Sequence, residues 1–141
     1  MKILTLCGSS RQNSTNQLLL SACRKILPSD YNWINFDLTT LPYFDPVLQF
    51  ESTPDIVLKF RKQAELSNYI LISTPEYAHG IPGVLKNALE WLICEETMKK
   101  NIVVFVASPS GGQYVKEYLL ETLKTMDLIV SEDSTMIITQ V

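Results

Sequence analysis

The sequence has little of the material from which metal centres and disulfide frameworks are built. It contains one histidine, His79, and three cysteines, Cys7, Cys23 and Cys94, which form no CxxC pair and no metal-ligand spacing. A zinc or iron site needs several such side chains close together, so no metal is expected. The three cysteines are therefore interpreted as reduced thiols of the core.

Long apolar runs and an excess of basic residues are also missing. No stretch of about 18 apolar residues occurs, and the first strand pattern begins at Lys2 without the apolar region of a secretory signal. The net charge is −3, so no broad cationic surface is available to neutralise nucleic acid or an anionic membrane. We expect a cytoplasmic protein that binds neither.

The rest of the composition is that of an ordinary globular protein. The chain has 141 residues, of which 46% are hydrophobic and 19% charged. This length suffices for one sizeable core, and no linker, internal repeat or low-complexity tract divides it. A single domain over residues 1–141 is expected.

Strand-like and helical patterns alternate along the whole chain. Apolar runs predict strands at residues 2–7, 32–36, 69–74, 102–107 and 128–130. Several are apolar throughout, which is typical of strands buried on both faces. Helices are predicted from Ser14 up to Pro28, from Thr53 through at least Ala64, and over residues 82–92 and 113–126. Such alternation favours an α/β fold, a doubly wound parallel sheet of five strands in the order 2-1-3-4-5, with ligands at the carboxyl ends of the strands.

Helix boundaries and buried faces follow from capping and periodicity. Ser14 is predicted to cap the first helix, with Gln17 completing a capping box, and Thr53 is predicted to cap the second before Pro54. The inward faces are expected to be Leu19, Ala22, Cys23 and Ile26 in the first helix, and Val57, Phe60 and Ala64 in the second.

The loop after the first strand, GSSRQNS at residues 8–14, is rich in hydroxyl groups. It lacks the GxGxxG pattern of dinucleotide sites and the Gly-Lys-Ser/Thr of a P-loop. Its serines, the forked cation Arg11 and the free amides of a helix start suit one phosphate monoester; a polar turn capped by Ser14 is the alternative. A CxxxxxR phosphatase is disfavoured, because Asn13 occupies the position where Cys7 would require arginine.

Two further loops follow the third and fourth strands. In STPEYAHGIPG, residues 73–83, prolines and glycines fix a compact backbone, while Tyr77 and His79 add planar groups that could clamp a flat heterocycle. His79 as a plain loop residue is the alternative. In ASPSGGQY, residues 107–114, Gly111 and Gly112 permit close approach ahead of a helix, a weak signal alone.

Together these stretches resemble the NADPH-dependent FMN reductase family, flavodoxin-like proteins that include quinone, azo-dye and chromate reductases. The resemblance extends from Lys2 to about Val130. The matching segments are Gly8-Ser9-Ser10-Arg11 with Ser14 and Asn16, Pro75-Glu76-Tyr77 with Pro82-Gly83, Leu85-Lys86-Asn87-Ala88-Leu89-Glu90-Trp91, and Ser110-Gly111-Gly112.

The resemblance implies an oxidoreductase with FMN as cofactor and NADPH or NADH as electron donor. A hydride would pass to FMN and on to a small acceptor such as a quinone or free flavin, with the chemistry on the flavin and no catalytic side chain. A flavin-binding or electron-carrying module without efficient NAD(P)H turnover is the alternative, and a scaffold acting through oligomerisation is a third possibility.

The resemblance also implies which residues bind FMN. The first loop would hold the phosphate, the second would line the isoalloxazine, and the third would border its other edge. The expected residues are Ser9, Arg11, Ser14, Thr15, Asn16, Pro75, Glu76, Tyr77, Ala78, His79, Ser110, Gly111 and Gly112.

Similar proteins usually continue past the fifth strand into a closing helix, whereas this sequence continues with the short, β-like SEDSTMIITQV. One face of the sheet is therefore expected to lack its last helix and to be covered by a partner subunit or by Met136 to Val141. A homodimer or homotetramer is expected, with an interface on the helices after the third and fourth strands. Trp91 is expected to lie either in this interface or in the core.

Overall fold

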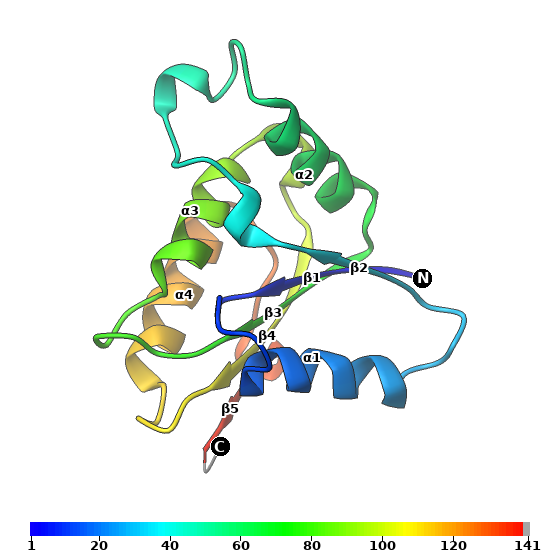
Figure 1. Ribbon diagram of the computed structural model, residues 1–141, viewed down its shortest axis with the longest axis vertical. Helices are drawn as coiled ribbons and strands as arrows, with labels where there is room; N and C mark the ends of the chain where they lie inside the picture. Colours follow the sequence, from blue (N-terminus) through cyan, green and yellow to red (C-terminus); the bar gives the residue numbers. More distant parts are fainter. Residues whose placement is uncertain (140–141) are drawn as a thin grey trace.

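The computed structural model, which describes residues 1–139, is built around a parallel five-stranded sheet (Figure 1). The strand order is β2-β1-β3-β4-β5, and every neighbouring pair is parallel. The predicted flavodoxin-like order 2-1-3-4-5 is therefore confirmed. The strands are β1 (Lys2–Cys7), β2 (Asn32–Phe36), β3 (Tyr69–Thr74), β4 (Asn101–Ala107) and β5 (Thr135–Ile138).

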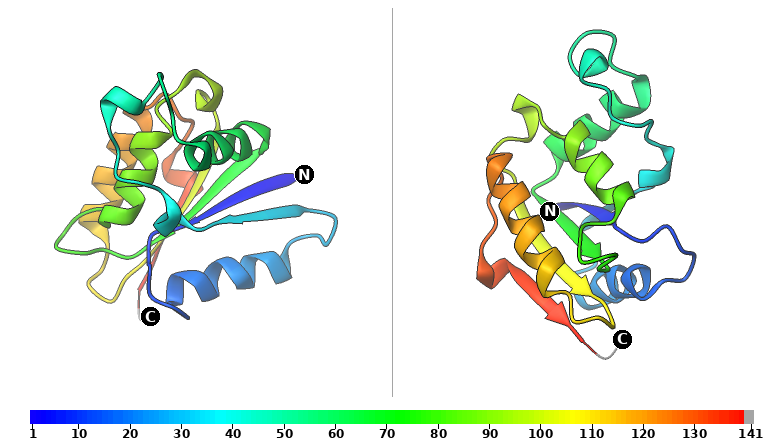
Figure 2. Two further views of the ribbon diagram at one scale, coloured as in Figure 1. Left: turned by 45° about the horizontal axis from the view of Figure 1, so that its top comes forward. Right: turned by 90° about the vertical axis from the view of Figure 1, so that its left-hand side faces the viewer.

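Helices cover the two faces of the sheet unequally. α1 (Thr15–Ile26) lies on one face, and α2 (Asp55–Leu66), α3 (Gly83–Trp91) and α4 (Gln113–Thr125) lie on the other (Figures 1 and 2). Within residues 1–139, α4 is the last α-helix and α1 alone covers its side of the sheet. The short 3-10 turns are η1 (Leu38–Thr40), η2 (Pro46–Leu48), η3 (Glu95–Thr97) and η4 (Glu132–Ser134).

The apolar strands supply side chains to two separate cores. In β1, Leu4 and Leu6 enter the large core beneath α2, α3 and α4, whereas Ile3 enters a small cluster beneath α1 with Leu20 and Leu71. Successive side chains of a strand point to opposite faces, which is why β1 is apolar throughout. The large core therefore provides most of the apolar burial.

The fifth strand lies later in the chain than the sequence pattern predicts. Residues 128–130 form only an isolated bridge, between Ile129 and Asn101, while β5 pairs with β4 from Val104 onward. Leu128 is buried at the end of α4 and contributes to the core. The predicted covering segment from Met136 is thus an edge strand as far as Ile138; its last residues, 140 and 141, lie outside the described part.

Three details of the helices also differ from expectation. α1 buries Asn16 and Leu20, whereas Ile26, predicted to face inward, is 82% exposed and Ala22 is exposed. Thr53 does not cap α2; its hydroxyl donates to the Gln49 carbonyl at 3.0 Å. The predicted Ser14 cap of α1 is confirmed, because the Ser14 side chain accepts from the Gln17 N–H. The predicted capping box does not form, since the Ser14 N–H donates to the Arg11 carbonyl at 3.3 Å.

Trp91 is fully buried and does not form a surface of α3. Its ring packs edge-on against Phe44 and its indole N–H donates to the Pro42 carbonyl at 2.8 Å. Of the two places expected for Trp91, the core is therefore confirmed and the subunit interface is wrong. Among residues 1–139, no helix is both long and apolar enough to cross a membrane.

Candidate functional site

Three loops meet at the carboxyl edge of the sheet. They follow β1, β3 and β4 and lie at the same end of the molecule (Figure 1). We call residues 8–14 the first loop, 75–82 the second loop and 108–112 the third loop. Parallel strands of a doubly wound sheet present their ligand sites at this edge, so the three sequences selected above are brought together.

The first loop is anchored closely to β3. The Gly8 N–H donates to the Ser73 carbonyl at 2.8 Å. A Cβ added at Gly8 would lie 2.5 Å from the Thr74 hydroxyl oxygen, which would be a steric clash. Glycine is required here because the loop passes directly over the end of β3.

Hydrogen-bond donors of the first loop and the start of α1 are left open. Within residues 1–139, the backbone N–H groups of Gln12, Asn13, Thr15 and Asn16 donate to no other residue. The first turn of α1 contains no acidic residue. Free N–H groups and the positive end of a helix dipole attract an anion. The loop therefore has the character of an anion-binding turn.

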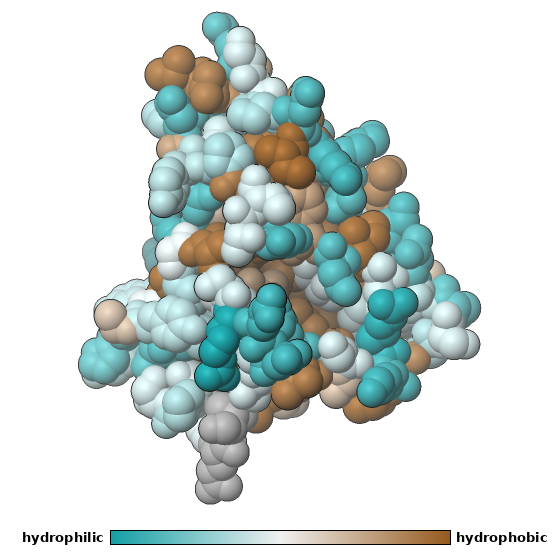
Figure 3. All heavy atoms as spheres, viewed as in Figure 1, coloured by the Kyte–Doolittle hydropathy of each residue, from teal (hydrophilic) through white to brown (hydrophobic). Residues whose placement is uncertain are grey.

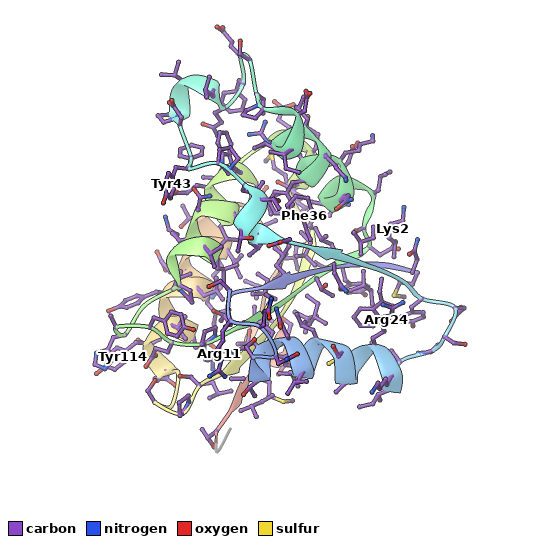
Figure 4. All side chains as sticks on the ribbon, viewed as in Figure 1. Lys2, Arg11, Arg24, Phe36, Tyr43 and Tyr114 are labelled. Carbon is purple, nitrogen blue, oxygen red and sulfur yellow. The ribbon has the colours of Figure 1, made fainter. Side chains whose placement is uncertain are left out.

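The side chains of the first loop add to this character. Ser9 is buried and its hydroxyl oxygen accepts from the Arg11 N–H at 3.4 Å. Ser14 accepts from Gln17, which leaves its hydroxyl proton free to donate. Arg11 is exposed and forms no ion pair within the described chain; Figure 4 shows it beside the start of α1.

Asn16 lies beneath the loop rather than in it. Its side chain is 3% exposed; the amide nitrogen donates to the Ala107 carbonyl at 3.2 Å, and the amide oxygen accepts from the Ser73 hydroxyl at 2.8 Å. Both polar ends are thus used within the protein. Asn16 ties α1 to the carboxyl ends of β3 and β4, and only its backbone N–H is directed at the anion-binding turn.

The second loop contains a tight hairpin whose central residues adopt left-handed backbone. Tyr77 and Gly80 exchange two backbone hydrogen bonds, at 3.2 and 2.9 Å, and Ala78 and His79 between them have φ of 49° and 58°. Positive φ at both central positions is the pattern of a type I′ turn, which favours asparagine and glycine. Ala78 therefore adopts a backbone that alanine disfavours.

Glu76 connects the second loop to the third. The residue is 7% exposed; one carboxylate oxygen accepts from the Val115 N–H at 3.0 Å and the other accepts from the Ser110 hydroxyl at 3.3 Å. Val115 lies in the first turn of α4, whose own N-cap, Gly112, has no side chain. Glu76 thus supplies the missing cap from a different loop and links the second loop to the third.

The third loop depends on its second glycine. Gly112 has φ of 82°, and a Cβ there would clash with the Val106 side chain. The Ser108 and Ser110 hydroxyls lie 2.9 Å apart and continue to Glu76. Glycine therefore permits the third loop to pass over the end of β4 while its serines bond to the second loop.

An exposed aromatic pair spans the second and third loops. The rings of His79 and Tyr114 are stacked, with centroids 4.2 Å apart and planes inclined by 19°. Tyr114 lies at the start of α4, at the end of the molecule where the loops gather (Figure 4). The sequence reading did not select Tyr114; its position next to the Gly111-Gly112 turn was the available signal.

A cleft of about 900 Å³ begins at the first loop. Ser9 and Ser10 line its mouth, but none of residues 75–79 or 110–112 does. From the mouth it runs between α1 and β2. The sequence did not predict this cleft, because most of its lining outside the first loop comes from α1, β1 and β2, which carry no motif.

The cysteines carry no sign of special reactivity. All three are free thiols, and burial raises the pKa of Cys23 and Cys94 above that of an ordinary thiol. A higher pKa means less thiolate at neutral pH and hence a less reactive sulfur. The residues 1–139 also contain no group of three His, Cys, Asp or Glu side chains arranged to hold a metal ion.

Comparison with known proteins agrees with this architecture. The 2-hydroxy-1,4-benzoquinone reductase of a Burkholderia species is 37% identical over 92 residues, which are 64% of this chain and 49% of that protein. The quinone reductase of Escherichia coli K12 is 34% identical over 138 residues, 92% of this chain and 73% of that protein. This chain therefore spans about half the length of the first relative and nearly three quarters of the second.

A solved structure with a similar fold is FerB, a flavoenzyme NAD(P)H:(acceptor) oxidoreductase from Paracoccus denitrificans. It superposes with a TM-score of 0.83 at 25% identity and covers 93% of this chain and 75% of that chain. The sequence model of one family, described as NADPH-dependent FMN reductase, matches residues 1–141. The chain belongs to the NADPH-dependent FMN reductase family.

Proposed function

We propose that this protein is an FMN-dependent NAD(P)H oxidoreductase that passes a hydride from NAD(P)H to bound FMN and then to a small acceptor such as a quinone or free flavin. The observation that carries the proposal is the set of N–H groups at the start of α1 that have no acceptor within residues 1–139, flanked by Arg11, which forms no ion pair in the same range. In a member of this family, such a turn fits the phosphate of FMN.

The proposed roles at the phosphate end follow from these open donors. Ser9, Ser14 and Arg11 would donate from their side chains, and Thr15 and Asn16 from the backbone of the first helical turn. A dianionic phosphate would gain charge-assisted hydrogen bonds, which are roughly twice as strong as neutral ones. The Asn16 side chain would act indirectly, by holding α1 against β3 and β4.

The second and third loops would hold the ring of the flavin. Within residues 1–139, the N–H groups of Glu76, Ala78 and His79 donate to no other residue, so they are free to meet polar ring atoms. Pro75 and Tyr77 would line the same edge, and Ser110 to Gly112 would border the opposite one. The Glu76 carboxylate, bonded to Val115 and Ser110, fixes the spacing between these loops.

Bound FMN would supply the hydride-accepting ring. The contribution of the chain is to hold that ring at a fixed place between two loops and to leave one side accessible to donor and acceptor. Because the flavin supplies the chemistry, no side chain of the three loops is proposed as a general acid or base. We also propose, on the resemblance to family members, a cytoplasmic homodimer or homotetramer.

A double variant tests the phosphate assignment. Ser9→Ala together with Arg11→Ala should weaken FMN binding at least tenfold, about 1.4 kcal/mol, because two phosphate donors are lost. Affinity would be measured from the quenching of flavin fluorescence on titration. Lys59→Ala, an exposed cation on α2, is the matched control. Unchanged affinity in the double variant would refute the assignment.

Reduction by the nucleotide tests the activity. The protein is loaded with FMN, freed of excess flavin and mixed with NADPH in the absence of oxygen, while the visible absorbance of the flavin is followed. Bleaching that is reversed by air or by a quinone is the expected result. Retained flavin that only dithionite bleaches would instead support an electron-carrying module, and no retained flavin would overturn the proposal.

A further inference from the structure

The cleft between α1 and β2 is large enough for a ligand of its own. Its volume of about 900 Å³ lies within the range of small-molecule sites. One wall is α1, from Gln17 to Lys25, and the other is the sheet surface formed by β1 and β2. On this face of the sheet α1 is the one helix of the described chain (Figure 2), and the cleft lies beside it.

The far end of the cleft is cationic. Arg24 and Lys25, in the last turn of α1, line it, and neither forms an ion pair within the part of the chain that the structure describes. Figure 4 shows Arg24 directed from α1 toward β1 and β2. Asp37, the one acidic residue of the lining, already accepts from the Thr39 N–H and hydroxyl. An anion would meet two free cations there.

An aromatic platform lies between these cations and the mouth. Trp33 of β2 is half-buried and lines the cleft beside Asn35, while Ser21 of α1 and Thr39 add hydroxyl groups. A half-exposed indole offers a face on which a flat heteroaromatic ring can stack. The amide and the hydroxyls supply donors and acceptors at the edge of such a ring.

The mouth of the cleft adjoins the proposed flavin site. Ser9 and Ser10 belong to the first loop, and Val84 lies in the first turn of α3, directly after the second loop. The face of the molecule seen in Figure 3 mixes hydrophilic and hydrophobic residues. A molecule that extends from the flavin site past the first loop would enter the cleft.

We propose that the cleft between α1 and β2 binds a planar heteroaromatic ring that carries a phosphate, with the ring on Trp33 and the phosphate on Arg24 and Lys25. Adenosine 2′-phosphate has this chemistry, and it is one end of NADPH; a free adenine nucleotide is the other source. Assignment to NADPH rests on the proposed function. In that case the cleft selects NADPH over NADH, because NADH lacks the 2′-phosphate.

The first test is a binding titration with adenosine 2′,5′-bisphosphate, followed by tryptophan fluorescence. The other tryptophan, Trp91, is fully buried, so the signal change should come from Trp33 and disappear in Trp33→Phe. The double variant Arg24→Gln with Lys25→Gln should weaken binding at least tenfold. Lys59→Gln, an exposed cation outside the cleft, should leave it unchanged.

Competition distinguishes the two sources of the ligand. If the adenosine end of NADPH occupies the cleft, NADPH displaces the bisphosphate, and the double variant raises the KM for NADPH about tenfold while that for NADH changes little. Displacement by AMP but not by NADPH identifies a free nucleotide. Both results support the cleft as a site.

Two results would overturn the proposal: no saturable fluorescence change with the bisphosphate, or binding that survives loss of both Arg24 and Lys25. Far-ultraviolet circular dichroism of the double variant accompanies the titration, because cations in the last turn also favour helix α1. If the protein binds the bisphosphate through these residues but does not reduce FMN, the proposed binding site stands and the proposed activity is refuted. The failures of the two proposals are therefore distinguishable.

Discussion

The phosphate end and the ring end of the proposed flavin site are built in opposite ways. At the start of α1, four backbone N–H groups are free and Arg11 is unpaired within the described chain. At the second and third loops, the buried Glu76 carboxylate occupies the N-terminus of α4, and His79 stacks on Tyr114. The phosphate end leaves its charged side chain open to a ligand, whereas the ring end uses its buried carboxylate to hold two loops together.

This difference follows from what each end has to do. A phosphate is bound by charge and donors, so its site is effective when those donors have no internal partner. A flat ring is held by the spacing of the walls around it, so its site is effective when the walls are fixed to each other. Asn16 lies below both ends and links α1 to β3 and β4.

The largest expected effect is therefore that of Asn16→Ala. The change leaves the buried Ser73 hydroxyl and Ala107 carbonyl without their partner, at a cost of about 1–3 kcal/mol each. The free energy of unfolding, measured by urea denaturation, should fall by roughly 2–4 kcal/mol. FMN affinity should fall as well, because the start of α1 loses its fixed position relative to the strand ends.

Asn68→Ala provides the matched control for that variant. The Asn68 side chain accepts from the Lys2 N–H in an exposed position, so its loss should cost well under 1 kcal/mol. If Asn16→Ala were as stable as Asn68→Ala and bound FMN normally, Asn16 would not link the two ends.

The second effect concerns the ring end alone. Glu76→Ala removes the acceptor of the Val115 N–H and should cost about 1.5–3 kcal/mol, whereas Glu76→Gln keeps an acceptor oxygen and should cost less. Differential scanning calorimetry would give the stabilities. Fluorescence titration should show weaker FMN binding in Glu76→Ala, with much of the loss restored in Glu76→Gln. Equal losses in both variants would mean that the charge, rather than the cap, is what matters.

The third change should stabilise the protein, whereas the first two should destabilise it. Ala78 has φ of 49° in the hairpin of the second loop, a position where asparagine is favoured. Ala78→Asn should therefore raise the free energy of unfolding by about 0.5–1 kcal/mol. Ala22→Asn in α1, an exposed helical position, should lower it by about 0.5 kcal/mol, since asparagine is a poorer helix former. Two changes of the same sign would remove the evidence for strain at the hairpin.

The local pattern of apolar and polar residues predicted most of the fold. β1, β2 and β3 have the bounds that their apolar runs indicate, and the order of the sheet follows from the alternation of strands and helices. β5 was misplaced because a run of three apolar residues does not reveal whether it forms a strand or closes a core. Leu128 is buried against the core, and the pairing with β4 begins only at Thr135.

The buried face of α1 shows why apolar periodicity alone did not identify the inward residues. Its buried positions begin with Asn16, a polar residue, followed by Leu20. A search for apolar periodicity selects the neighbouring stripe that ends at Ile26, because an asparagine lowers the apparent hydrophobicity of the true face. What makes Asn16 an inward residue is its contact with Ser73 and Ala107, 57 and 91 positions away.

The candidate site was likewise predictable only in part. The three loops were predictable, because each follows a strand and contains glycine, proline or hydroxyl residues. The Glu76 contact with Val115 and the stack of His79 on Tyr114 join different loops, and no spacing within one loop indicates them. The assignment of the thirteen FMN-binding residues remains a prediction that the variants above test.

The smallest effect should come from Glu132→Gln, which lies outside both ends. The Lys116 ammonium beside Glu132 lowers the pKa of that carboxyl and ties α4 to η4. A lowered pKa means that the pair stabilises the folded protein at neutral pH and that this contribution is lost as the pH falls through the lowered pKa. The melting temperature of the variant should thus lie slightly below that of the wild type at pH about 7, converge with it in acid, and approach it in high salt. Because Glu132 touches neither loop, FMN affinity should stay unchanged; a loss of affinity here would show that the ring end extends as far as β5.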